Sequence, residues 1–384
     1  MRSLDKRIKT SLDVIKLNNL NLITDLKIVN DCVNFKDRIK SDYNIKYKQK
    51  EEKSYNSELE EEFGSINNID DDKNLTKFID IKFYGENLGS KFISNNVLIN
   101  IINNLFFKTE IRMKNRIINI FSKSKVKDSF IDKIISVFDF FDTLTNTKNR
   151  YVLDIYLSKN RKLINVNDDT LKPDNINSGL TAPGFYIVLF RKEEVIKLLF
   201  HELVHYLHLD MILYQNKFKK LYNDINLKAS IVNPNEAYTE LLAILFMSIW
   251  KYYYFDYKEY YDLNSYISKT LTVELGWSYY QISKILKFFK CYDSYEDLFT
   301  NNCEFRQDSN VLSYYFLKTY FLQNINIILK NISLKNLRIS ENESDYILNN
   351  TNLKDDTFVN NINKVIELNQ DIYDNKSLRM TCLD

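Results

Sequence analysis

Residues that interrupt regular structure are scarce in this sequence, which has 6 glycines and 3 prolines among 384 residues. Their scarcity favours long helices. A membrane-spanning helix needs about 20 apolar residues, whereas the most apolar run, Leu241 to Trp250, has ten. The opening residues, MRSLDKRIKTSLDVIK, lack the apolar core of a signal peptide. We therefore expect a soluble, intracellular protein, placed in the cytoplasm.

Cysteine pairs and excess charge are also missing. Cys32, Cys291, Cys303 and Cys382 are at least twelve positions apart, so the sequence has no CxxC motif. This spacing predicts isolated thiols in a reducing compartment. The net charge is +2, from 53 basic and 51 acidic residues. Such a balance gives no general electrostatic reason to expect a nucleic acid or a membrane as partner.

The sequence can nevertheless form a large core, because 45% of it is hydrophobic. Helical patterns cover 97–107 and 117–141, and patterns typical of strands cover 151–157 and 185–190. Gly179, Pro183 and Gly184 mark a loop before the second strand. A helix is expected at about 192–214, with Glu193 and Glu194 in its first turn, and another from about 234. The fold class is therefore α+β and mainly helical.

Composition divides the chain into four consecutive parts. Residues 1–45 are predicted to be a helical N-terminal arm, and the charge-dense stretch 46–75 a solvated linker. Residues 76–330 would form the main folded domain. Residues 331–384 would be a C-terminal extension that packs on it. The oligomeric state is not indicated.

All three histidines of the chain, His201, His205 and His208, lie within eight positions of one another. On a helix, positions 201 and 205 differ by about 40° and one turn, so their imidazoles can converge on one ion. Glu202 lies about 100° further round, where its carboxylate can approach a water on the metal. This HExxH spacing predicts a zinc site at which Glu202 is the general base.

The helix that carries the motif is apolar on most sides, so it is expected in the core. Buried histidines need partners or a metal, because an unpaired buried polar group costs about 1–3 kcal/mol. His208 lies about 10 Å along the helix axis from His201, too far for both to bind one tetrahedral ion. We expect His208 to be a core or rim residue and not a ligand.

The third ligand is expected to be a carboxylate, with a cysteine as the alternative, since no histidine remains further along the chain. The best segment is Asn233–Glu240, in which Glu236 and Glu240 share a helix face. Asn233 and Glu236, with a proline between them, also match a helix capping box. Capping and metal binding by Glu236 remain alternatives at this point, and Glu240 remains the alternative third ligand.

The motif and this segment together resemble the gluzincins, HExxH zinc peptidases whose third ligand is a glutamate on the next helix. Their thermolysin-like members carry N-E-A-x-S-D, and this chain has NEAYTE at 235–240. The resemblance covers about 60 residues and implies a zincin-like unit with a small sheet, in which 185–190 is an edge strand. It implies that Glu236 is the ligand and that Glu240 orients a histidine. The layout also resembles proteins of large DNA viruses, which adds the virion as an expected location.

The predicted function is a zinc-dependent metallopeptidase with His201, His205 and Glu236 as ligands and a peptide or protein as substrate. A tyrosine, Tyr314 or Tyr315, is expected to stabilise the oxyanion. Three alternatives remain open. They are an inactive scaffold with a degenerate zincin fold, a zinc amidohydrolase for small substrates, and a protease whose basic N-terminal arm binds nucleic acid.

Overall fold

The computed structural model divides into two compact units that interleave along the chain. The sheet unit comprises Asp37–Lys162 and Asn177–Leu207, and the helical unit comprises Met1–Lys36, Leu163–Ile176 and His208–Asp384. This division differs from the four consecutive parts that composition predicted, 1–45, 46–75, 76–330 and 331–384. No helix among the described residues is long and apolar enough to cross a membrane. The structure describes 2–18, 47–51, 84–89, 92–146, 148–165, 167–210, 225, 227–229, 232–291, 294–300, 303–328, 339–372 and 376–384.

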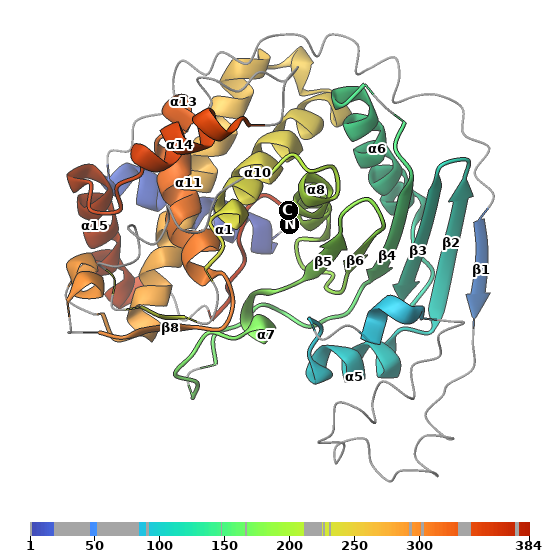
Figure 1. Ribbon diagram of the computed structural model, residues 1–384, viewed down its shortest axis with the longest axis horizontal. Helices are drawn as coiled ribbons and strands as arrows, with labels where there is room; N and C mark the ends of the chain where they lie inside the picture. Colours follow the sequence, from blue (N-terminus) through green and yellow to red (C-terminus); the bar gives the residue numbers. More distant parts are fainter. Residues whose placement is uncertain are drawn as a thin grey trace. The chain divides into compact units, whose positions relative to one another are not determined.

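A mixed six-stranded sheet organises the sheet unit, in the order β1-β2-β3-β4-β6-β5 (Figure 1). The central strands β3, β4 and β6 run parallel, and β1, β2 and β5 add antiparallel pairings at the two ends. The helices and strands of the chain together make the fold class α+β and mainly helical, as predicted. The strands are β1 (Tyr47–Glu51), β2 (Phe107–Met113), β3 (Arg116–Ser122), β4 (Tyr151–Tyr156), β5 (Gly179–Ala182) and β6 (Tyr186–Leu189).

Both faces of this sheet are covered, which explains its apolar central strands. Helix α5 (Asn95–Asn104) packs on one face, where Phe121 and Tyr156 stack with ring centroids 4.5 Å apart. Leu153 and Ile155 point to the opposite face by strand alternation and are also fully buried. Helices α6 (Asp128–Leu144) and α8 (Val195–Tyr206) belong to this unit, and α8 contacts β5 and β6.

Four expectations for this unit are corrected. The single helix predicted over 117–141 is a strand, β3, followed by α6, because β-branched residues with helix-compatible spacing also suit a buried strand. The loop predicted around Gly179 contains strand β5. The strand predicted at 185–190 exists as β6, but it lies between β4 and β5, so β5 is the edge strand. Strand β1 also falls inside the predicted 46–75 linker, whose residues 52–75 lie outside the described part.

The helical unit is built around two long buried helices, α10 (Asn235–Tyr254) and α11 (Leu263–Phe288). Helix α1 (Arg2–Asn18) packs on α11 at Gly276, where an added Cβ would lie 2.6 Å from the carbonyl oxygen of Ser11. The rest of the predicted 1–45 arm lies outside the described residues. The unit also contains α7 (Pro173–Ile176), β7 (Leu227–Ala229), β8 (Phe305–Gln307), a π-helix η6 (Leu312–Leu317), α12 (Lys318–Gln323), α13 (Ile325–Ile328), α14 (Glu341–Asn349) and α15 (Asp356–Ile372).

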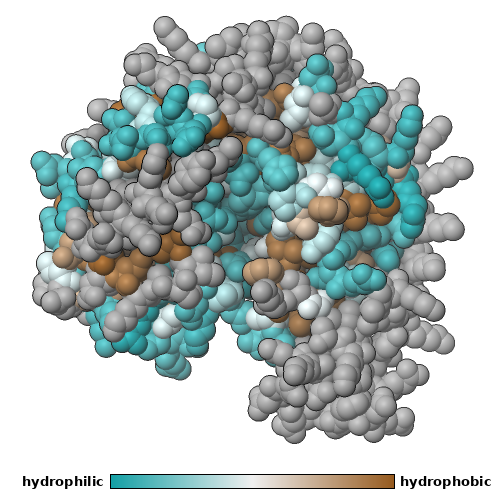
Figure 2. Space-filling model, in the orientation of Figure 1, coloured by the Kyte–Doolittle hydropathy of each residue, from teal (hydrophilic) through white to brown (hydrophobic). Residues whose placement is uncertain are grey.

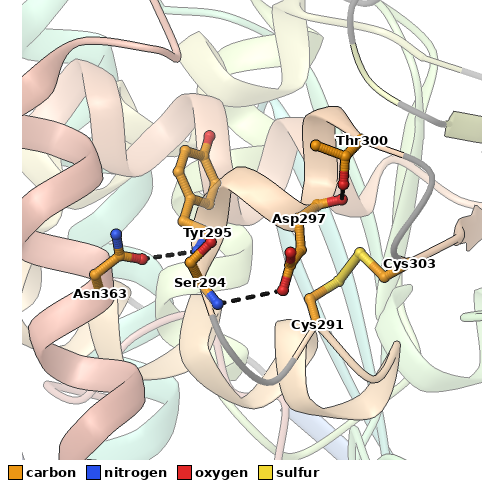
Figure 3. Close-up of a disulfide and its surroundings, with 7 residues drawn as sticks. All are labelled: Cys291, Ser294, Tyr295, Asp297, Thr300, Cys303 and Asn363. Atoms are coloured by element: carbon orange, nitrogen blue, oxygen red, sulfur yellow. Dashed lines mark hydrogen bonds between the residues drawn. A yellow bond between two sulfur atoms is a disulfide. The ribbon is translucent and has the colours of Figure 1, made fainter.

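A disulfide joins Cys291, just after α11, to Cys303, just before β8 (Figure 3). The expectation of isolated thiols is therefore wrong for this pair. Pairing across twelve positions depends on how the chain folds between the cysteines, which spacing does not reveal. Cys382 is a buried free thiol, and burial raises its pKa well above the ordinary value. Cys32 lies outside the described residues.

The segment enclosed by the disulfide is a short 3-10 helix, η5 (Tyr295–Phe299), shown in Figure 3. Ser294 and Asp297 form a capping box at its start. The backbone N–H of Tyr295 donates to the side-chain oxygen of Asn363 on α15 at 2.7 Å. This hydrogen bond fixes the start of η5 against α15.

Candidate metal centre

Helix α8 carries the HExxH motif, and all of its residues except His205 are buried. Phe200 packs edge-on against Phe140 of α6, with ring centroids 5.7 Å apart. At the other end of the helix, the hydroxyl of Tyr206 donates to the carbonyl of Arg150, just before β4, at 2.6 Å. The predicted buried position of the motif helix is confirmed. The helix begins at Val195, later than expected.

The two histidines converge as predicted. Their Nε2 atoms lie 3.1 Å apart, and the ring planes meet at 78°. Two nitrogens bound to one tetrahedral zinc, each at about 2.1 Å, would be about 3.4 Å apart. The observed separation also suits a hydrogen bond between two neutral imidazoles, in which one ring donates and the other accepts. His201 is buried and His205 is half-buried, so the pair lies at the boundary of the core.

Glu202 is held by the edge strand β5. Its Oε2 accepts a 2.6 Å hydrogen bond from the hydroxyl of Thr181. Gly179 gives the carboxylate room, because an added Cβ there would lie 2.6 Å from Oε1 of Glu202. Glu202 is 5% exposed, so this hydrogen bond satisfies a carboxylate that has little access to water. The edge strand thus fixes the position of the predicted general base.

A buried group of charged side chains holds the start of α8. Lys162 and Glu194 form an ion pair at 3.0 Å, with both side chains at most 2% exposed. The carboxylate of Glu193 accepts a hydrogen bond from the backbone N–H of Lys162 at 2.8 Å. Glu194 adopts a left-handed conformation, φ 58°, and is the N-cap of the helix. The two glutamates therefore bind Lys162 and precede the helix, whereas the sequence analysis placed them in its first turn.

Arg191 links the same region to β5. Its guanidinium donates to the carbonyl oxygens of Asn177 and Arg161, each at 2.8 Å. Asn177 lies two residues before β5, and Arg191 lies four residues before α8. The buried side chain of Arg191 therefore connects the residues that precede the edge strand to those that precede α8. Sequence reasoning missed Arg191 and Lys162. The signal that the sequence offered was a basic residue directly beside an apolar segment, Lys162 before Leu163–Ile164 and Arg191 after 185–190.

Glu236 and Glu240 lie on α10, in the helical unit. Glu236 is half-buried in the first turn, and its Oε1 lies 3.5 Å from the side-chain nitrogen of Asn233. The carbonyl of Asn233 accepts from the backbone N–H of Glu236 at 3.2 Å, and Asn233 is itself fixed by Asn310 at 2.9 Å. Glu240, one turn further along, is 1% exposed. The predicted helix thus exists, but its N-cap is Pro234, which makes no side-chain cap hydrogen bond, so the capping box expected from Asn233 and Glu236 is not formed.

His208 lies beyond the end of α8, with a φ of 53°, and is exposed. It belongs to the rim, one of the two positions expected for it, and the break in the helix separates it from the HExxH turn. Tyr315 is buried, and its hydroxyl donates to the carbonyl of Leu378 at 2.5 Å. That hydrogen bond engages Tyr315 in the helical core, so Tyr314 is the tyrosine that remains for the predicted oxyanion role.

Comparisons with known proteins give a partial likeness to a viral protein. No family model and no solved structure matches the chain. This chain is similar to a mimivirus protein. The relative, described as uncharacterized protein R210 of Acanthamoeba polyphaga mimivirus, is 33% identical over 177 residues, which cover 43% of this chain and 44% of the relative. The chain therefore matches less than half of the relative's length, and the description names no activity.

Proposed function

We propose that this chain is a zinc-dependent metallopeptidase in which His201, His205 and Glu236 bind Zn²⁺. The observation that carries the proposal is the convergence of the two Nε2 atoms beside a carboxylate that β5 holds in place. A further support is the NEAYTE segment at 235–240, which begins helix α10 and offers Glu236 as a half-buried carboxylate in the first turn. Two imidazoles and one carboxylate form a donor set typical of catalytic zinc.

Bound Zn²⁺ would polarise the substrate carbonyl and make water a better nucleophile at neutral pH. Glu202 accepts the proton from the attacking water and delivers it to the leaving amine. The hydroxyl of Thr181 limits the orientations of this carboxylate and leaves its second oxygen for the proton transfer. Glu240 is proposed to orient a metal-binding histidine. In metal sites generally, a carboxylate that accepts a hydrogen bond from the second ring nitrogen fixes the orientation of such a histidine.

The edge strand favours a peptide as substrate. β5 is the last strand of the sheet in the described part of the chain, and an extended peptide can pair with such an edge through its main chain. The β5–β6 turn exposes Phe185, which is 76% accessible. Hydrophobic side chains also gather over the β5 and β6 part of this unit in Figure 2. A peptide bound along β5 would lie next to Glu202, because Thr181 of this strand contacts its carboxylate.

Metal content of the purified protein tests the ligand set. Elemental analysis is expected to give about one zinc per chain, and both His205→Ala and Glu236→Ala are expected to lose it. His208→Ala is the matched control, since this exposed histidine is not a proposed ligand and its variant should keep the metal. Absence of zinc from the wild type after reconstitution would refute the proposal. Zinc retained by Glu236→Ala would refute the third ligand.

Hydrolysis of a fluorogenic peptide library tests the reaction. Glu202→Gln is expected to keep zinc and to lose turnover, because the amide cannot accept the proton. Glu193→Gln changes a neighbouring carboxylate outside the motif and serves as the control for charge removal. Normal turnover in Glu202→Gln would refute the mechanism. Zinc binding by the wild type without cleavage of any peptide would favour the scaffold instead.

A further inference from the structure

The segment 376–384 is held within the helical unit by an unusual set of hydrogen bonds. Five consecutive main-chain carbonyls, from Lys376 to Met380, each accept a hydrogen bond from another part of the unit. A strand would use the backbone of a neighbouring strand for this purpose, but here four of the five donors are side chains. The donors are the backbone N–H of Ile164 (2.8 Å), Lys284 Nζ, Tyr315 Oη (2.5 Å), Trp277 Nε1 (3.0 Å) and Lys318 Nζ (3.2 Å).

The apolar side chains of the segment lie at every second position and are buried. Leu378, Met380 and Cys382 are 0%, 3% and 0% exposed; of the two residues between them, Arg379 is half-buried and Thr381 is 0% exposed. The hydroxyl of Thr381 donates to the carboxylate of Glu274, which is itself fully buried. The part of the helical unit around this segment, called the groove below, therefore accepts apolar side chains at every second position and fixes one polar side chain between them.

The groove is formed by elements that precede the segment in the chain. Lys284, Trp277 and Glu274 lie on α11, Tyr315 on the π-helix η6, and Lys318 at the start of α12. Main-chain hydrogen bonds that run along an extended peptide, with pockets for alternate side chains, are the features by which proteins bind peptide ligands. The helical unit has this arrangement, with the chain's own segment as the occupant.

We propose that this groove is a peptide-binding site, occupied here by residues 376–384, and that it binds the same sequence when it is supplied as a separate peptide. The ligand class is an extended peptide with apolar side chains at its third and fifth positions, a threonine at its sixth and a small apolar side chain at its seventh. The proposal concerns the helical unit alone and is independent of zinc binding or peptidase activity.

The test uses a full-length variant, Leu378→Asp with Met380→Asp, in which the segment loses two buried apolar side chains while the groove is unchanged. The probe is a fluorescein-labelled peptide, KSLRMTCLD. We expect saturable binding to the variant by fluorescence anisotropy. The wild type should bind the peptide far more weakly, because its own segment competes at an effective concentration of about millimolar. The matched control is the same peptide carrying both aspartates, which should not bind.

Two further measurements keep the test decisive. Trp277→Phe, added to the variant, removes one donor while retaining a ring, and should weaken peptide binding about 2- to 12-fold. Where the double variant does not fold, the peptide is added during refolding, and recovery of the helical circular dichroism is expected. A folded variant that binds no peptide, or an unfolded one that the peptide does not restore, would overturn the proposal.

Discussion

Replacement of Gly179 by alanine tests how the edge strand holds Glu202. The new Cβ would lie 2.6 Å from Oε1, 3.0 Å from Cδ and 3.1 Å from Cγ of Glu202, so three atoms of the same side chain are crowded at once. The closest contact must lengthen from 2.6 Å to an ordinary 3.4 Å, a displacement of about 0.8 Å. Such a movement would also disturb the hydrogen bond from Thr181.

A catalytic group misplaced by about 1 Å can lower the rate about 10²-fold. We therefore expect Gly179→Ala to lower kcat/KM for peptide hydrolysis by about that factor and to keep its zinc. Crowding in a packed site should also destabilise the fold by about 1–3 kcal/mol, measured by chemical denaturation. Unchanged stability and unchanged turnover together would refute the reasoning.

A pair of variants at Thr181 separates the hydrogen bond from the crowding. Thr181→Ser keeps a hydroxyl and should retain most of the turnover, whereas Thr181→Val keeps the shape and removes the donor. Loss of a hydrogen bond to a charged group costs about 1.5–3 kcal/mol. The valine variant should therefore lose about 10- to 150-fold in kcat/KM if that bond is fully used in the transition state. Equal activities for the two variants would show that the hydroxyl does not position Glu202.

Three predictions concern the rest of the molecule. Burial raises the pKa of Asp154 above its ordinary value, so the stability gained from its protonated form is full below the unfolded pKa and is lost as the pH rises through the folded pKa. Asp154→Asn should therefore raise the melting temperature more at pH 7 than at pH 4, and equal shifts at the two pH values would contradict this. Lys162→Met should cost about 3–5 kcal/mol because it leaves Glu194 buried without its ion-pair partner, while adding Glu194→Gln should recover part of the loss in urea unfolding. Replacing both Cys291 and Cys303 by serine should lower the free energy of unfolding by about 2–4 kcal/mol, and a wild type that is insensitive to reductant would count against a bond of this strength.

The sequence predicted the motif helix and the convergence of its two histidines because both depend on local spacing. His201 and His205 are four residues apart, so any helix brings their rings together, and the apolar residues around them require burial. The same reasoning predicted strand β4, strand β6 and the beginning of α10 at Asn235. Each of these elements carries its signal in a few adjacent residues.

Local pattern failed where two structures share one pattern. The isoleucines of 117–120 suit either a helix or a buried strand, and pairing with β2 and β4 decides for β3. Gly179 looked like part of a loop, but pairing with Leu189 places it in the edge strand β5. The lack of a side chain at this position leaves room for the carboxylate of Glu202. The position of a strand within a sheet depends on its neighbours, so β6 could not be recognised as interior from its own residues.

The sequence by itself thus determined the helix that carries His201, Glu202 and His205 and the helix that carries Glu236, while their proposed roles in metal binding and proton transfer remain predictions. Tertiary structure decided which residues that are far apart in the sequence come into contact. Thr181 reaches Glu202 across 21 positions, Lys162 reaches Glu194 across 32, and Lys318 reaches Met380 across 62. Contacts of this kind leave no periodic trace, because each side chain looks like an ordinary polar residue until the fold brings its partner within hydrogen-bonding distance.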